Sequence, residues 1–103
     1  MAEQRPAATK PRIRHTMFRV KDLERSVRFY TEVLGMKEFR RNENEGGKYT
    51  VVFLGFGDEN KDPAIELTYN WGQDDGYELG TGYGHVAIGY PDIYDICNKV
   101  EEF

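Results

Sequence analysis

The chain has 103 residues, 39% of them apolar and 14% aromatic, which is enough for one domain with a modest core. Its formal charge of -4 is mild and mixed in sign, so it lacks the broad basic surface of a nucleic-acid-binding protein, and no apolar run is long enough to span a bilayer. The one cysteine, Cys97, cannot form an internal disulfide, which fits a reducing compartment. The sequence therefore predicts a soluble cytoplasmic domain with no nucleic-acid or membrane partner.

The first elements can be placed from their residue patterns. Residues 1–11 are polar and lack the apolar segment of a signal peptide, so they are predicted to be a disordered tail. RIRHTMFRV (12–20) is rich in branched and aromatic residues and predicts a strand. Asp22 then stands in an N-cap position, and Gly35 stands where a helix often ends in a left-handed residue. Apolar residues recur at helical spacing between them, at Leu23, Val27, Tyr30 and Leu34.

Three further strands are predicted after this helix, at residues 36–42, 48–56 and 63–70. The segments between them, residues 43–47 and 57–62, carry the glycine, asparagine and aspartate typical of turns. The predicted order of elements is therefore β-α-β-β-β.

The start of this unit recurs later in the chain. HTMFRVKDLERSVRFY begins at His15 and HVAIGYPDIYDICNKV begins at His85, an offset of 85 − 15 = 70 residues. In each copy an aspartate, Asp22 or Asp92, follows seven residues after the histidine and precedes a helical pattern. A repeat of this kind suggests duplication of one structural unit.

The repeat predicts how the chain is divided. Residues 12–80 are predicted to form a complete βαβββ module, and residues 81–103 the first strand and helix of a second. The three strands needed to complete the second module would take about 25 to 35 more residues. We therefore expect the chain to be truncated within its second module.

Residues with metal-ligand chemistry fall on the strand faces that point away from the predicted core. Side chains alternate between two faces along a strand, so His15 shares a face with Arg19, and Glu66 in AIELTYNWG shares one with Asn70. His85 opens the predicted strand of the second copy in the same way. Imidazole nitrogen and carboxylate oxygen are ligands for zinc, nickel or cobalt, so the two histidines and the glutamate are candidate ligands. Arg19 and Asn70 lie about 13 Å further along their strands, where a cation and an amide could hold the far end of a long anionic substrate.

Each of these residues also has an ordinary structural interpretation. A strand histidine is more often a surface or hydrogen-bonded residue than a ligand. Glu66 could be solvated on the polar face of an antiparallel strand, and Arg19 and Asn70 could be ordinary surface residues. The coincidence of three ligand types on three strands, each on the face away from the core, favours the metal site.

Four other side chains could contribute either to packing or to a functional site. Cys97 is interpreted as a small core residue of the second helix rather than as a nucleophile. Trp71, Tyr77 and Tyr83 flank a glycine-rich loop, and the sequence leaves open whether they pack the fold or line a pocket. The glycines of GTGYGH lack the spacing and the lysine of a phosphate-binding loop, which argues against a nucleotide site there.

The stretches RHTMFRVKDLERSVRFYTEVLGMK, AIELTYNWG and YELGTGYGHVAI resemble glyoxalase I (lactoylglutathione lyase) of the vicinal oxygen chelate superfamily, and in particular its short bacterial and plant-type members. The resemblance implies an α+β fold in which paired βαβββ modules form a metal-holding cleft. The implied activity is isomerisation of the hemithioacetal of methylglyoxal and glutathione to S-D-lactoylglutathione. This reaction detoxifies methylglyoxal by metal-assisted proton transfer through an enediolate.

The matched motifs also imply roles for individual residues. His15, Glu66 and His85 would be metal ligands, with nickel or cobalt expected and zinc as the alternative. Arg19 and Asn70 would bind the glutamyl end of the cosubstrate glutathione. Glu66 would have only a secondary catalytic role, because the family's principal base is its counterpart in the second module. The 70-residue offset projects that glutamate to about position 136, outside this chain.

Short members of the family share each active site across a homodimer, with the His15 and Glu66 type of ligand from one subunit and the other pair from its partner. The resemblance therefore implies a homodimer with shared sites. The alternative hypothesis is a catalytically inactive truncated module that binds metal or pairs with partner chains through an exposed sheet edge. Other reactions of the superfamily, such as epimerisation or dioxygenation, are disfavoured by ELTYNWG together with Arg19.

Overall fold

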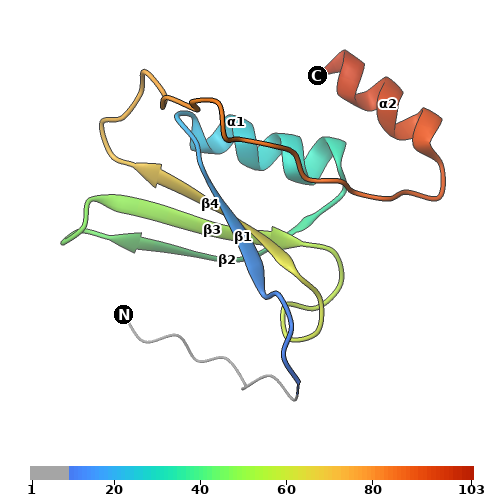
Figure 1. Ribbon diagram of the computed structural model, residues 1–103, viewed down its shortest axis with the longest axis horizontal. Coiled ribbons are helices and arrows are strands. Elements are labelled where there is room, and N and C mark those ends of the chain that lie inside the picture. The colour runs from blue at the N-terminus through green and yellow to red at the C-terminus, as the bar shows by residue number, and fades with distance from the viewer. Residues whose placement is uncertain (1–9) are drawn as a thin grey trace.

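A computed structural model describes residues 10–103, so the predicted tail at residues 1–11 lies almost entirely outside the described residues. The described chain forms one four-stranded sheet with a helix across one face (Figure 1). The strands are β1 (His15–Arg19), β2 (Lys37–Asn44), β3 (Tyr49–Gly55) and β4 (Ala64–Asn70). The helices are α1 (Leu23–Arg28), the π-helical turn η1 (Phe29–Val33) and α2 (Ile93–Glu102).

The sheet has the order β1-β4-β3-β2. β1 runs parallel to β4, while β4, β3 and β2 pair in antiparallel fashion through two turns. The predicted order β-α-β-β-β is confirmed, with strand bounds that shift by at most three residues. The helical connection carries the chain from β1 at one edge of the sheet to β2 at the other, and the antiparallel strands β3 and β4 then return it to lie beside β1.

The predicted first helix forms, with a change of type along its length. The Asp22 side chain caps α1 by accepting a backbone N–H from its first turn at 3.1 Å, and Gly35 ends the helix with φ of 83°. The second half widens into η1, where the Leu34 N–H donates to the carbonyl of Phe29, five residues back, at 3.1 Å. Such an i→i−5 bond adds one residue to a turn. Helical periodicity predicts the apolar face of this segment, while the extra residue depends on packing.

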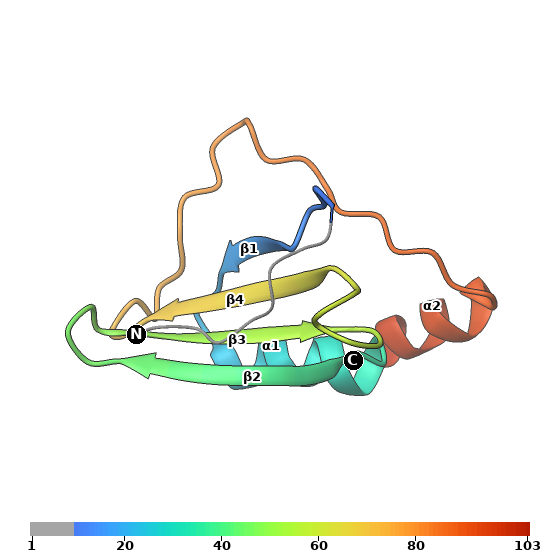
Figure 2. The same cartoon turned by 90° about the horizontal axis from the view of Figure 1, so that it is seen from below.

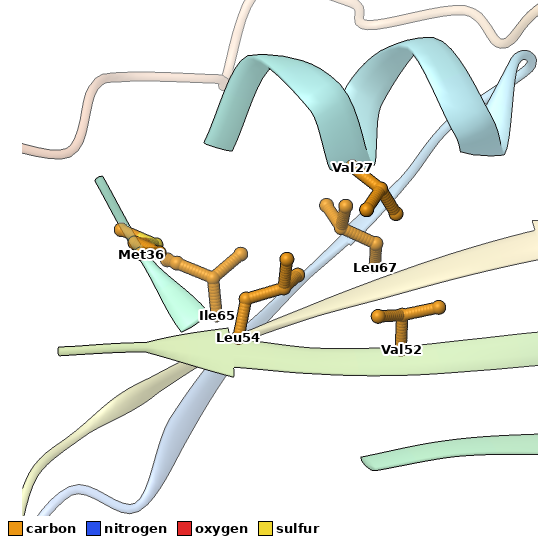
Figure 3. Packing of buried hydrophobic residues seen from close by; sticks show 6 residues of the cluster. All are labelled: Val27, Met36, Val52, Leu54, Ile65 and Leu67. Carbon is orange, nitrogen blue, oxygen red and sulfur yellow. The ribbon is translucent and has the colours of Figure 1, made fainter. Parts of the chain in front are cut away.

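The core lies between α1 and the sheet (Figure 3). Every second side chain of β3 and of β4 points into this core, and the intervening side chains of each strand point to the other face of the sheet. Figure 3 labels its six buried members: Val27, Met36, Val52, Leu54, Ile65 and Leu67. Ile65 and Leu67 therefore face the helix as predicted, and Glu66 lies on the opposite face, here called the open face of the sheet.

The second copy of the repeat is only partly regular. α2 begins at Asp92, whose side chain accepts the backbone N–H groups of Tyr94 and Asp95, just as Asp22 caps α1. The strand predicted from His85 is not formed: within residues 10–103 this segment is extended but pairs with no strand. A strand needs a ladder partner, and here the segment is held instead by Tyr90, whose hydroxyl donates to the Leu34 carbonyl at 2.6 Å.

The helix of the second copy packs differently from the first. Both views place α2 beyond η1 rather than over the sheet (Figures 1 and 2), and none of its residues is buried. Cys97 is exposed, so its interpretation as a core residue is wrong for this structure, because α2 meets the module only at one end. Within residues 10–103, no helix has both the length and the apolar character needed to cross a membrane.

Candidate metal centre

Two of the predicted ligands meet on the open face. His15 begins β1, and the parallel register pairs Met17 with Glu66, so His15 and Glu66 point to the same face from neighbouring strands. The distance from His15 Nε2 to Glu66 Oε1 is 3.2 Å, with side-chain exposures of 31% and 17%. The His15 ring packs against Phe53 of β3 in an edge-to-face arrangement, with ring centroids 5.3 Å apart. The sheet therefore presents an imidazole and a carboxylate that face each other.

The separation of these two atoms fits ligands of one metal ion. Imidazole nitrogen and carboxylate oxygen bind zinc at about 2.0 to 2.2 Å, so two such atoms lie about 3.0 Å apart at a right angle and about 3.4 Å apart at a tetrahedral angle. The observed 3.2 Å lies between these values. The other ring nitrogen, His15 Nδ1, is buried and has no hydrogen-bond partner among residues 10–103, which leaves Nε2 as the atom directed at Glu66.

The second oxygen of Glu66 is already engaged. The Thr68 hydroxyl donates to Glu66 Oε2 at 3.1 Å, and Thr68 is only 6% exposed. Face alternation in AIELTYNWG puts these two residues on one face, but it does not reveal the hydrogen bond. Sequence reasoning therefore missed the contact between Thr68 and Glu66, although the face that they share could be read from the strand pattern.

A cavity of about 280 Å³ adjoins the pair on the open face. It extends from the two candidate ligands over β3 and β2 toward the turn that joins these strands. Its lining combines apolar and aromatic side chains with amides, two carboxylates and the imidazole: His15, Asn42, Glu43, Asn44, Tyr49, Val51, Phe53 and Glu66. The two candidate ligands thus lie beside a space that a small molecule could occupy, and the contribution of β2 to it was not anticipated from the sequence.

The predicted cation and amide lie further along the same face. The parallel register of β1 and β4 places Arg19 opposite Thr68, which lies two residues before Asn70 on the same face of β4. Arg19 is exposed, and Asn70 Oδ1 accepts a hydrogen bond from the Tyr77 hydroxyl at 2.9 Å. The structure therefore brings Arg19 and Asn70 to one end of the open face, although neither lines the cavity beside His15.

His85 does not join the pair within this chain. It is exposed, on the extended segment before α2, and residues 10–103 contain no group of three metal-ligating side chains. One chain thus assembles two of the three predicted ligands.

The aromatic residues whose roles the sequence left open have different surroundings. The Trp71 indole donates to the Thr50 hydroxyl at 2.8 Å, and the Tyr83 ring lies 6.2 Å from that of Phe18 in an edge-on arrangement. These two residues pack against the module, whereas the Tyr77 hydroxyl donates a hydrogen bond to Asn70 at the end of the open face.

Burial, together with the nearby Tyr83 hydroxyl, raises the pKa of Tyr30 above its ordinary value.

Sequence comparison with known proteins indicates the same family as the fold and the candidate ligands. Residues 12–103 match the model of the glyoxalase/bleomycin resistance protein/dioxygenase superfamily. The chain is 54% identical over 90 residues to a probable lactoylglutathione lyase of Vibrio parahaemolyticus, covering 87% of this chain and 64% of that protein. It is 52% identical over 91 residues to a lactoylglutathione lyase of Escherichia coli O157:H7, covering 88% of this chain and 67% of that enzyme.

Solved structures agree as well. Glyoxalase I of Zea mays superposes with a TM-score of 0.84 at 46% identity, over 88% of this chain and 32% of the maize chain. A trypanothione-dependent glyoxalase I of Leishmania major gives a TM-score of 0.84 at 45% identity, over 90% of this chain and 66% of the other. The chain thus spans about two thirds of the length of the curated relatives described above. It belongs to the glyoxalase/bleomycin resistance protein/dioxygenase superfamily.

Proposed function

We propose that this chain supplies part of the active site of a lactoylglutathione lyase (glyoxalase I). The reaction would be isomerisation of the hemithioacetal of methylglyoxal and glutathione to S-D-lactoylglutathione. The observation that carries the proposal is the facing pair of His15 Nε2 and Glu66 Oε1, 3.2 Å apart beside a cavity on the open face. Relatives about 50% identical to this chain are named for the same activity, which supports the assignment.

His15 and Glu66 are the residues of this chain that would hold the metal, and His85 is proposed as a third ligand. Nickel or cobalt is our first expectation and zinc the alternative, since all three accept imidazole and carboxylate ligands. A bound divalent ion would supply Lewis-acid stabilisation of the negative charge that develops on the substrate oxygens.

The remaining proposed roles belong to side chains of the open face. The Oδ1 atom of Asn70 accepts the Tyr77 hydroxyl, so the amide N–H groups of Asn70 would be the ones to donate to a substrate. Arg19 adds a positive charge at the same end of the sheet. This combination suits the charged glutamyl end of glutathione. Glu66 would assist proton transfer in a secondary role, because the principal base is expected to be a glutamate of a complete second module.

We also propose a homodimer in which each site draws on two chains. His85 lies outside the pair formed by His15 and Glu66, so a partner's copy would provide the third ligand. The division into a module at residues 12–80 and the start of a second at residues 81–103 is part of the same proposal. A cytoplasmic location fits the single cysteine, which has no partner within the chain.

A turnover assay tests the proposal directly. The purified chain would be supplied with nickel, cobalt or zinc, then with glutathione and methylglyoxal, while thioester formation is followed by absorbance. Turnover by this chain would be metal-dependent and would fall at least about 100-fold in His15→Ala and Glu66→Ala, because each change removes a proposed direct ligand. Glu101→Ala, an exposed change on α2, should leave the rate unaltered.

The same assay separates this function from the alternative of an inactive module. Metal binding without turnover at any metal would favour a module that only binds metal or pairs with partner chains. Turnover that survives both ligand substitutions would show that the pair is not the site of the reaction.

A further inference from the structure

We propose that Thr68 is a positioning residue that makes Glu66 a one-oxygen metal ligand. This inference rests on the metal site of the proposed function and adds a determinant of its geometry. The two carboxylate oxygens of Glu66 have different partners: Oε1 lies 3.2 Å from His15 Nε2, whereas Oε2 accepts the Thr68 hydroxyl at 3.1 Å. The hydroxyl thus holds the carboxylate so that only one oxygen faces the imidazole.

The position of Thr68 makes this hydrogen bond persistent. It lies on the inner strand β4, opposite Arg19 of β1 on one side and Val51 of β3 on the other. With 6% exposure, its hydroxyl has little access to water, so loss of the bond to Glu66 would leave a buried donor unsatisfied. A β-branched side chain also has few χ1 rotamers, which restricts the position of the hydroxyl oxygen.

The hydrogen bond from Thr68 to Glu66 affects both the metal affinity of the site and the number of coordination positions left for a substrate. A hydrogen bond to a carboxylate is charge-assisted and stronger than one between neutral groups. Groups that orient metal ligands in this way typically contribute 10- to 100-fold to metal affinity. A glutamate that binds through one oxygen also leaves more coordination positions for a substrate than one that binds through two.

Two substitutions at Thr68 separate its hydroxyl from its shape. Thr68→Val keeps the branched side chain and removes the hydroxyl, while Thr68→Ser keeps the hydroxyl. The probe is nickel, titrated calorimetrically into the whole chain. We expect Thr68→Val to weaken nickel binding about 10- to 100-fold and Thr68→Ser to stay within about threefold of the parent chain.

Thr50 offers a matched control. It is also a strand threonine with 6% exposure, but it lies on the helix side of the sheet, where its hydroxyl accepts the Trp71 indole N–H. Thr50→Val therefore removes a buried hydroxyl without touching Glu66, and its nickel affinity should match that of the parent chain. A general effect of losing a buried hydroxyl would lower both affinities alike.

The outcomes distinguish this inference from the proposed function. Nickel affinity in Thr68→Val equal to that of the parent chain, or loss of affinity in Thr50→Val as well, overturns the role of Thr68 and leaves the metal site standing. If the parent chain itself binds no nickel, cobalt or zinc, the metal site and this inference both fail. Should Thr68→Val fail to fold by circular dichroism, Thr68→Ala replaces it. The visible absorption of bound cobalt then adds a second readout, because a change in the oxygens supplied by Glu66 alters its band intensities.

Discussion

Truncation of Leu67 tests the assignment of faces on β4, on which the candidate site depends. Leu67 has 0% exposure and points toward Val27 of α1 (Figure 3), whereas its neighbour Glu66 points to the open face. Burial of a leucine side chain is worth about 1.5 to 3 kcal/mol, and Leu→Ala changes in cores cost about 2 to 5 kcal/mol once the cavity is included. We expect Leu67→Ala to fall in the upper half of that range.

The reason lies in the rigidity of the surroundings. β4 is flanked by β1 and β3, and two further core residues, Val52 and Leu54, are also 0% exposed, so little can move in to fill the space. A domain of this kind has a free energy of unfolding of about 5 to 15 kcal/mol. Leu67→Ala would therefore remove a large part of the stability of the chain.

Urea denaturation of the parent chain and the variant, followed by circular dichroism, measures this change from the shift in midpoint at constant slope. Leu79→Ala is the control, because Leu79 is 70% exposed and its loss should change the unfolding free energy by less than about 0.5 kcal/mol. A cost below about 1 kcal/mol for Leu67→Ala, or equal costs for the two variants, would refute the placement of Leu67 in the core and with it the face assigned to Glu66.

Two further predictions concern the first helix. Asp22→Ala removes the cap of α1 and should lower the unfolding free energy by about 1 kcal/mol in the same urea experiment, whereas Asp75→Ala, an exposed loop change, should have almost no effect. The raised pKa of Tyr30 means that the folded state holds this proton more tightly than the unfolded state. The corresponding stability is therefore complete below the ordinary pKa of about 10 and is lost as pH rises through the folded value. Tyr30→Phe should flatten the fall in urea midpoint measured between about pH 8 and pH 11, and an unchanged pH profile would contradict the assigned cause.

The local elements of the module could be predicted because their signals lie in neighbouring residues. Asp22 and Asp92 cap their helices since a side chain can reach the N–H groups two or three residues ahead without help from the rest of the fold. Alternation along AIELTYNWG likewise separates Glu66 from Ile65 and Leu67, because strand geometry alone assigns their faces. The nature of the candidate ligands at His15 and Glu66 follows from the same local reasoning.

Features that depend on long-range packing were not predictable in this way. Residues 85–90 carry a strand pattern but form no ladder, because pairing requires a neighbouring strand and not only suitable residues. The widening of the first helix at η1 and the exposure of Cys97 on α2 depend on how these helices meet the module. The same is true of the separation of His85 from the other candidate ligands.

The sequence by itself determined which residues have metal-binding chemistry and which strand face carries His15 and Glu66, because residue chemistry and a two-residue period are local properties. Only the tertiary structure decided that β1 and β4 are parallel neighbours, which brings His15 Nε2 to 3.2 Å from Glu66. It also decided that the Thr68 hydroxyl donates a hydrogen bond to the other carboxylate oxygen of Glu66. Distances between side chains on different strands depend on strand order and register, and these are decided by the packing of the whole sheet against its helix.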